Sequence, residues 1–195
     1  MFLYKYKNYE EYVSAQIEGN RKKLNIQWSK RDEIEFLSSY LVSNFSPLVL
    51  GICHGTRQGN EQKWFAEFTK AHVIGTEIGE KAEDFPNTIK WDFNKVKDEW
   101  INNIDFIYSN SFDHAINPTE CLKTWMSCLK ATGCCIIEWT PKHTESYANI
   151  TDPFGASLKE YEELITKCGF KIKQQLKYKP INSKYCKFYF VIIKP

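Results

Sequence analysis

The chain has 195 residues and a formal net charge of +2, with lysines scattered along its length. This length suits one domain with a full hydrophobic core. The scattered charge excludes the class of strong nucleic-acid binders that carry a basic tract. Aromatic residues make up 15% of the chain, enough for both a core and a pocket that stacks a flat ring.

The seven cysteines predict free thiols rather than a disulfide framework, because their number is odd and Cys134 and Cys135 are adjacent. A reducing compartment, the cytoplasm, is therefore expected. No Cys-x-x-Cys or His-x-x-x-His pair occurs, so we expect no metal site. The N-terminus lacks the apolar core of a signal peptide and no apolar run is long enough to span a bilayer, so no membrane partner is expected.

Residues 9–40 have apolar positions at helical spacing, interrupted near Gly19 and Asn20, and predict one or two helices. From Ser46 onward, strand and helix patterns alternate. Strands are expected at 48–53, 72–77, 88–93, 104–109, 133–140, 170–178 and 186–194, and helices at 60–70, 95–102, 118–131 and 157–168. This alternation predicts an α/β fold whose parallel sheet is covered by helices on both faces. The short connection between the last two strands predicts that they are antiparallel, because parallel neighbours need a longer crossover.

The most informative segment runs from Leu48 to Glu61, where an apolar strand gives way to a loop with glycines at 51, 55 and 59. Such a loop between a strand and a helix brings free backbone N–H groups to a ligand. The lysine of a P-loop and the Gly-x-Gly-x-x-Gly spacing of a dinucleotide site are both missing. Glu77 closes the next strand at a distance that suits an acid bonding ribose hydroxyls, although a solvated acid at a strand end is the alternative.

The seven strands, the final antiparallel pair, the Gly-rich loop and the acid closing the second strand together resemble the class I S-adenosylmethionine-dependent methyltransferases. The resemblance covers about residues 45–195, and it is greatest to the small, type 11-like members. It implies a Rossmann-like, seven-stranded, mostly parallel sheet with an antiparallel last strand. It also implies S-adenosyl-L-methionine as the cofactor, in a domain spanning 46–195. Residues 1–45 precede this domain as a helical extension, for which we expect a lid over the acceptor side, with a helix that merely packs on the sheet as the alternative.

The resemblance assigns cofactor-binding residues motif by motif. In that family the loop after the first strand wraps the methionine part of the cofactor, the acid ending the second strand binds the ribose, and an acid after the third strand bonds the adenine. A polar segment after the fourth strand, here Ser109 to His114, lies near the transferred methyl. The implied cofactor-binding residues are Gly51, Cys53, His54, Gly55, Gly59, Glu77, Ile78, Asp92, Phe93 and Asn110.

The first motif departs from the family pattern, which has an acid before a Gly-x-Gly-x-Gly loop. Gly51, Cys53 and Arg57 stand where an acid and two glycines are expected, and the loop is about two residues longer. The usual contact to the methionine amino group is therefore in question. Asp92 has a second interpretation as the N-cap of the helix expected at 95–102, for which Asn94 is equally suitable.

Asp113 and His114, with Asn110 beside them, are the candidates for catalysis, because a histidine next to a carboxylate can move a proton near neutral pH. Methyl transfer from a sulfonium also proceeds by positioning, so a structural or orienting role for His114 is the alternative. Glu138, His143 and Tyr147 follow or end the fifth strand and are candidates for the acceptor site. Aromatic residues of the leading segment, Tyr9, Tyr12 or Trp28, are candidates for covering it.

The sequence therefore predicts an enzyme that methylates a small polar acceptor, for which a hydroxyl or amine of a sugar or nucleotide sugar is the leading candidate. Two alternatives stay open. An RNA or cap methyltransferase would use Lys142, Lys177, Lys179 and Lys184 as a basic groove. A catalytically inactive partner subunit would explain the altered first motif.

Overall fold

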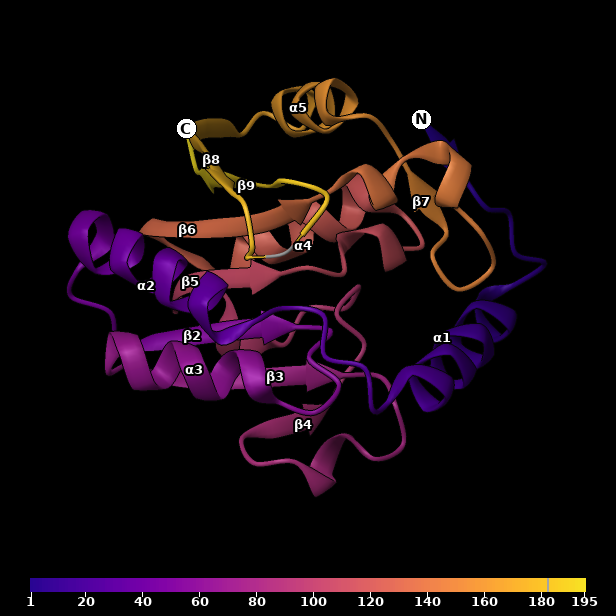
Figure 1. Ribbon diagram of the computed structural model, residues 1–195, viewed down its shortest axis with the longest axis horizontal. Helices are drawn as coiled ribbons and strands as arrows, with labels where there is room; N and C mark the ends of the chain where they lie inside the picture. Colours follow the sequence, from indigo (N-terminus) through magenta and orange to yellow (C-terminus); the bar gives the residue numbers. More distant parts are fainter. Residues whose placement is uncertain (182) are drawn as a thin grey trace.

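The computed structural model describes residues 1–181 and 183–195, and its centre is a twisted sheet (Figure 1). Among the described residues this sheet has seven strands in the order β4-β3-β2-β5-β6-β9-β8. They are β2 (Leu50–His54), β3 (His72–Glu77), β4 (Thr88–Lys90), β5 (Ile104–Ser109), β6 (Leu129–Trp139), β8 (Lys171–Tyr178) and β9 (Lys187–Ile193). The first five are parallel, and β9 lies antiparallel between β6 and β8. The predicted α/β fold and the antiparallel final pair are confirmed.

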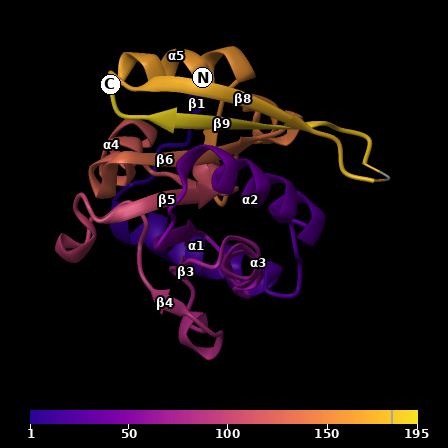
Figure 2. The same cartoon turned by 90° about the vertical axis from the view of Figure 1, so that its left-hand side faces the viewer.

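Helices cover both faces of this sheet (Figure 2). The α-helices are α1 (Tyr9–Lys23), α2 (Arg31–Phe45), α3 (Asn60–Thr69), α4 (Pro118–Cys128) and α5 (Leu158–Lys167). Short 3-10 turns lie at Ala82–Asp84, Asp98–Trp100, Phe112–His114, Pro141–His143 and Glu145–Tyr147. A small separate pair, β1 (Phe2–Leu3) with β7 (Phe154–Gly155), ties the N-terminus to the segment after β6. No sequence pattern predicts this pair, because each strand has only two residues.

Strand side chains alternate between two apolar cores, because successive residues of a strand point to opposite faces. In β5, Phe106 and Tyr108 pack beneath α2 and α3, whereas Ile107 packs beneath α4 and α5. Buried strands of this kind carry runs of apolar residues, and these runs predicted where the strands lie in the sequence. All seven cysteines are free, as expected. None of the described helices is long and apolar enough to cross a lipid bilayer.

The N-terminal segment divides into two parts with different surroundings. Helix α2 lies beside α3 and contributes Ile34, Leu37 and Leu41 to the core. Helix α1 lies apart, beyond the carboxyl ends of β2 and β3 (Figure 1). The helix break expected near Gly19 is wrong: α1 continues to Lys23, because Gly19 is buried and fits against Thr151. The break instead falls between Lys23 and Arg31.

Three further sequence expectations need correction. The helix expected at 95–102 is a single 3-10 turn, Asp98–Trp100, because Trp100 is its one buried residue and a lone apolar anchor gives no helical stripe. Helix α4 ends at Cys128, and the residues from Leu129 on already belong to β6. The third strand is also shorter than expected and ends at Lys90, so Asp92 lies in the following loop.

Candidate functional site

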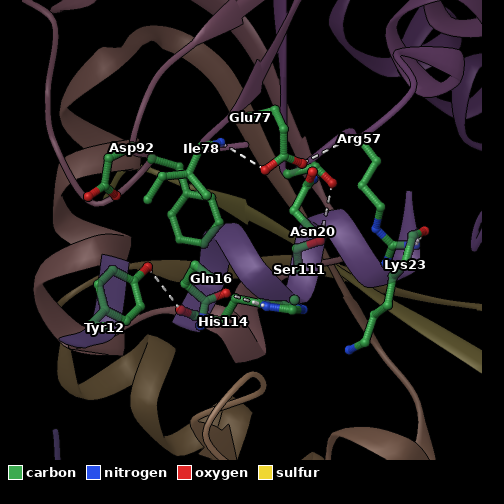
Figure 3. A pocket seen from close by; sticks show the side chains of 13 residues that line it. Tyr12, Gln16, Asn20, Lys23, Arg57, Glu77, Ile78, Asp92, Ser111 and His114 are labelled. Carbon is green, nitrogen blue, oxygen red and sulfur yellow. Dashed lines mark hydrogen bonds between the residues drawn. The ribbon is translucent and has the colours of Figure 1, made fainter. Parts of the chain in front are cut away.

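A cavity opens where the carboxyl ends of the parallel strands meet α1 (Figure 3). This is the edge at which parallel α/β sheets bind ligands. The cavity is narrow, with a volume of about 40 Å³. The walls are Tyr12, Gln16, Gly19, Asn20, Lys23, Gly55, Arg57, Glu77, Ile78, Asp92, Phe93, Ser111 and His114. The structure thus brings the residues predicted from three separate sequence motifs to one cavity.

Glu77 ends β3, and its carboxylate is held rigidly by backbone donors. The N–H of Arg57 donates to Glu77 Oε2 at 2.9 Å, and the N–H groups of Ile78 and Gly79 donate to Oε1 at 2.8 and 3.2 Å. These three bonds hold the carboxylate in place while leaving further lone pairs free. Glu77 therefore has the chemistry required to accept hydrogen bonds from a pair of hydroxyl groups.

The loop after β2 approaches the cavity closely at Gly55. Its φ of 75° lies in the left-handed region, and a Cβ atom here would come within 2.7 Å of Ser111 Oγ. Gly59 has the same φ and serves as the N-cap of α3, where a Cβ would approach Gln62 Nε2 at 2.6 Å. Both positions require glycine. Of these two glycines, only Gly55 lines the cavity. Gly59 shapes the turn that leads into α3.

Asp92 and Phe93 lie at the end of the cavity nearest Tyr12. The hydroxyl of Tyr9 donates to Asp92 Oδ2, and the N–H of Asn94 donates to Oδ1 at 2.9 Å. Neither Asp92 nor Asn94 caps a helix, because the helix expected after them does not form. The ring of Phe93 packs edge-on against Trp125 and presents a flat apolar wall to the cavity.

Three predicted cofactor contacts, Gly51, Cys53 and His54, do not lie in the cavity. Gly51 faces Phe106, whose ring would be 2.3 Å from a Cβ atom, and Cys53 belongs to the core under α2 and α3. His54 is stacked on Trp125 with ring centroids 4.7 Å apart, and burial lowers its pKa to about 3. These residues belong to β2 itself, which ends only at His54. The usable part of the loop therefore begins at Gly55.

A buried carboxylate that sequence reasoning missed lies under the same loop. Glu61, in the first turn of α3, accepts from Gln27 Nε2 at 2.9 Å and from Asn110 Nδ2 at 3.4 Å through Oε1. Its Oε2 atom is buried without a partner. Burial raises the pKa of Glu61 to about 7. Glu61 faces a small recess that it shares with Gly55, Thr56, Arg57 and Asn110.

A second cavity adjoins the first on the side of β5 and β6 and holds about 880 Å³ of space open to solvent. Its walls are Lys23, Ile26, Trp28, Arg57, Asn110, Ser111, Asp113, His114, Lys142, His143, Tyr147, Asn149 and Asp152. The three predicted catalytic residues, Asn110, Asp113 and His114, all line it. His143 and Tyr147 also line it, whereas Glu138 is fully buried and instead accepts a hydrogen bond from Trp28 Nε1 at 2.5 Å.

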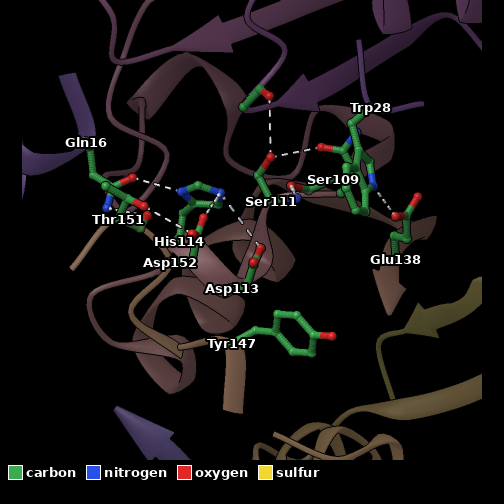
Figure 4. Close-up of polar contacts among 12 residues, drawn as sticks. Gln16, Trp28, Ser109, Ser111, Asp113, His114, Glu138, Tyr147, Thr151 and Asp152 are labelled. Atoms are coloured by element: carbon green, nitrogen blue, oxygen red, sulfur yellow. Dashed lines mark hydrogen bonds and ion pairs between the residues drawn. The ribbon is translucent and has the colours of Figure 1, made fainter. Parts of the chain in front are cut away.

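The polar segment after β5 connects the two cavities (Figure 4). Asn110 Nδ2 donates to Ser29 Oγ at 2.8 Å, and its Oδ1 accepts from Ser111 Oγ at 2.8 Å. Asp113 Oδ1 is buried and has no hydrogen-bond partner. His114 Nε2 lies 3.2 Å from Asp152 Oδ1 and 4.0 Å from Asp113 Oδ1. Although burial opposes it, His114 together with Asn149 and Lys23 lowers the pKa of Asp152 to about 2.

Comparison with solved structures identifies this architecture. At 12% sequence identity, the chain superposes on the 1,6-didemethyltoxoflavin-N1-methyltransferase of Burkholderia thailandensis, solved with S-adenosylhomocysteine, with a TM-score of 0.74. The match covers 98% of this chain and 93% of that one. The chain has the class I methyltransferase fold. No protein-family model and no curated protein sequence matches it.

Other solved proteins with the class I methyltransferase fold match over most of the chain. The magnesium protoporphyrin IX methyltransferase of Synechocystis, solved with S-adenosylmethionine, has a TM-score of 0.65 and 12% identity over 97% of this chain and all of that one. A methyltransferase from Aquifex aeolicus has a TM-score of 0.58 and 16% identity over 85% of this chain and all of that one. In all of these the fold is shared while the sequence has diverged.

The residues that sequence reasoning missed come from parts of this methyltransferase fold that carry no motif. Glu61 is one acid among many at helix starts, and Asp152 stands in an irregular segment after β6. Gln16 is a buried polar residue of α1 that faces the cavity. The sequence singles out Arg57 only because it stands where the first motif is expected to have a glycine. Of the aromatic candidates in the leading segment, Tyr12 lines the first cavity and Trp28 the second, whereas Tyr9 lines neither.

Proposed function

We propose that this protein binds S-adenosylmethionine and transfers its methyl group to a small polar acceptor, with a hydroxyl or amine of a sugar or nucleotide sugar as the leading class. The observation that carries the proposal is that the two cavities adjoin and share Lys23, Arg57, Ser111 and His114 in their walls. A donor in the first cavity therefore faces an acceptor in the second. A matching protein named for methylating a small heterocycle supports an acceptor of this size.

The residues present fit the cofactor on two observations. Gly55 brings the backbone into the cavity wall at a φ of 75°, where a Cβ would collide with Ser111, and Glu61 offers a buried oxygen without a donor. We assign Glu77 to the ribose hydroxyls, Phe93 to the adenine face and Glu61 to the methionine ammonium group. Glu61 would then replace the acid that the first motif lacks, and the ammonium group would satisfy its free oxygen. Bound S-adenosylmethionine supplies a methyl group already activated by a sulfonium.

Asp113 is the group best suited to take the acceptor's proton. Asp113 lies in the wall of the second cavity, and its Oδ1 atom has no hydrogen-bond partner. His114 contacts Gln16 through Nδ1 and Asp152 through Nε2, and these two contacts hold its ring in place. We therefore assign His114 to orienting Asp113 and the acceptor, and not to proton transfer. Asn110 connects this segment to the recess around Glu61. Orientation of this kind and removal of one proton are the two contributions that methyl transfer to a hydroxyl needs.

The leading segment contributes a lid. Of residues 1–45, the part before α2 supplies Tyr12, Gln16 and Lys23 to the cavity walls. Helix α2 is part of the core, so we assign the lid to α1 and the residues leading to Trp28 alone. A cover of this kind excludes water from the reacting groups.

The test is methyl transfer from S-adenosylmethionine labelled in its methyl group, with a fractionated pool of small cellular metabolites as acceptors and purified RNA as the competing substrate. We expect the methyl label in a small-molecule fraction. The rate of labelling should fall by a factor of about 10²–10⁴ in Asp113→Asn. It should be unchanged in Asp98→Asn, which alters an exposed residue and serves as the control. Label in RNA would establish the nucleic-acid alternative. Cofactor binding without any label transfer would establish the inactive partner subunit.

A further inference from the structure

Three side chains converge where the two cavities meet: Asp113 and His114 from the turn after β5, and Asp152 from the segment after β6 (Figure 4). One ligand atom from each lies within 4.8 Å of the other two. His114 Nε2 is 3.2 Å from Asp152 Oδ1 and 4.0 Å from Asp113 Oδ1. Two carboxylate oxygens therefore face one imidazole nitrogen.

The hydrogen bonds around His114 determine which of its nitrogens carries a proton. Gln16 Nε2 donates to the backbone oxygen of Thr151 at 3.0 Å, which turns Gln16 Oε1 toward His114 Nδ1 at 2.9 Å. An amide oxygen only accepts, so Nδ1 is the protonated nitrogen. In a neutral imidazole Nε2 would then aim its lone pair at Asp152. That contact is repulsive unless a proton or a metal cation lies between them.

A single proton does not satisfy this cluster. On Nε2 it would bond to Asp152 Oδ1, but Asp113 Oδ1 at 4.0 Å is beyond hydrogen-bond distance. Asp113 is 7% exposed, and that oxygen has no other partner. A buried carboxylate oxygen without a donor is costly. A metal cation between the three side chains would contact all of them.

The charges around the cluster favour binding of such a cation. Lys23 Nζ lies 3.2 Å from Asp152 Oδ1 and 3.4 Å from Oδ2. Asn149 Nδ2 and Thr151 Oγ1 both donate to Oδ2, at 2.9 and 3.0 Å, so Oδ1 is the atom that faces His114. Two carboxylates and one lysine leave a net negative charge at the cluster. A bound divalent cation would make the net charge of the cluster positive.

We propose that Asp113, His114 and Asp152 bind a divalent transition-metal cation, Mn²⁺ or Zn²⁺. A site with one imidazole nitrogen and two carboxylate oxygens favours these ions over Mg²⁺ and Ca²⁺, which prefer oxygen ligands alone. The site revises the sequence expectation of no metal, which rested on the spacing of cysteines and histidines. With the cation bound, Asp113 Oδ1 would be a metal ligand and would no longer take the acceptor's proton directly. The cation, in the wall of the second cavity, would bind an acceptor oxygen and favour the loss of its proton to the medium.

The inference rests on side-chain geometry and is independent of methyl transfer, so binding of the metal alone tests it. The full chain, freed of metal with a chelator, is titrated calorimetrically with MnCl₂ and ZnCl₂, and with MgCl₂ for comparison. We expect one saturable site for Mn²⁺ or Zn²⁺, weakened by at least about tenfold in Asp113→Asn and in Asp152→Asn. Asp98→Asn, an exposed acid on another turn, should bind as the original chain does.

Melting temperatures show whether each variant is folded, and the electron paramagnetic resonance spectrum of Mn²⁺ with the unaltered chain gives a reading that needs no variant. Loss of the free-ion signal on adding protein supports the site. Absence of saturable binding of both ions at millimolar concentration would overturn the proposal. Equal binding by Asp113→Asn and Asp98→Asn would overturn it as well.

Discussion

Replacing Glu61 with glutamine should make the protein more stable and its cofactor binding weaker. Burial raises the pKa of this carboxyl from 4.5 to about 7. The unfolded chain therefore loses its proton at lower pH than the folded protein does. Stability falls as the pH rises from about 4.5 to about 7, because ionised Glu61 is disfavoured in the fold, and the penalty is constant above that range.

The size of this penalty follows from the shift, since each pKa unit corresponds to about 1.4 kcal/mol. A rise from 4.5 to about 7 gives a cost of about 3 kcal/mol above neutral pH. Glutamine has the same shape, stays neutral and keeps an oxygen that accepts from Gln27. Its new amide hydrogens lack an acceptor, which reduces the gain by about 1 kcal/mol or more.

Urea unfolding without cofactor measures the effect at two pH values. Near about pH 8.5 we expect Glu61→Gln to be about 1–2 kcal/mol more stable than the original chain, and near about pH 5 we expect no gain. S-adenosylhomocysteine should bind the variant at least about tenfold more weakly, because the ammonium group loses its charged partner. Glu35→Gln, an exposed acid on α2, should change neither property. A variant with unchanged stability at both pH values and unchanged affinity would refute the roles assigned to Glu61.

Three further variants test other parts of the account. Glu77→Ala should cost about 1–3 kcal/mol of S-adenosylhomocysteine affinity by calorimetry, because ribose hydroxyls would lose their acceptor, and full affinity would refute the assignment. Gly55→Ala should lower both melting temperature and affinity, since its Cβ would lie 2.7 Å from Ser111 Oγ at a φ of 75°; normal values for both would contradict the required close approach. Asp105→Asn should lower stability by about 1–3 kcal/mol at neutral pH, because the carboxylate accepts two backbone N–H bonds at the start of β2 and pairs with Lys130. Its pKa is lowered by Lys130 and these N–H groups in spite of partial burial, so the difference should fade as the pH falls below the ordinary range of an aspartate, and a deficit that persists in acid would contradict this explanation.

The parts of the fold that could be predicted are those governed by periodicity. Buried parallel strands such as β5 carry apolar runs, here Phe106 to Tyr108, and the connection before β9 is too short for a crossover. The expectation failed at 95–102, where apolar residues are present but only Trp100 reaches the core. Whether an apolar side chain reaches the core depends on the packing of neighbouring elements, which the local sequence does not show.

The site was predictable where it follows strand ends. Glu77 and Asp113 could be placed because parallel strands all present their carboxyl ends at one edge. Gly51 and Cys53 were misplaced because the strand continues to His54 and carries them into the core. Glu61 and Asp152 reach the site through tertiary packing, so only the folded chain shows them beside the predicted residues.

The most direct test of the central claim is calorimetric titration of the purified full chain with S-adenosylhomocysteine. We predict saturable binding to one site, accompanied by a rise in melting temperature, with both effects weakened in Glu77→Ala and preserved in Glu35→Gln. Absence of both binding heat and a melting shift at millimolar ligand, in protein shown to be folded, would contradict the claim that the first cavity is a cofactor site.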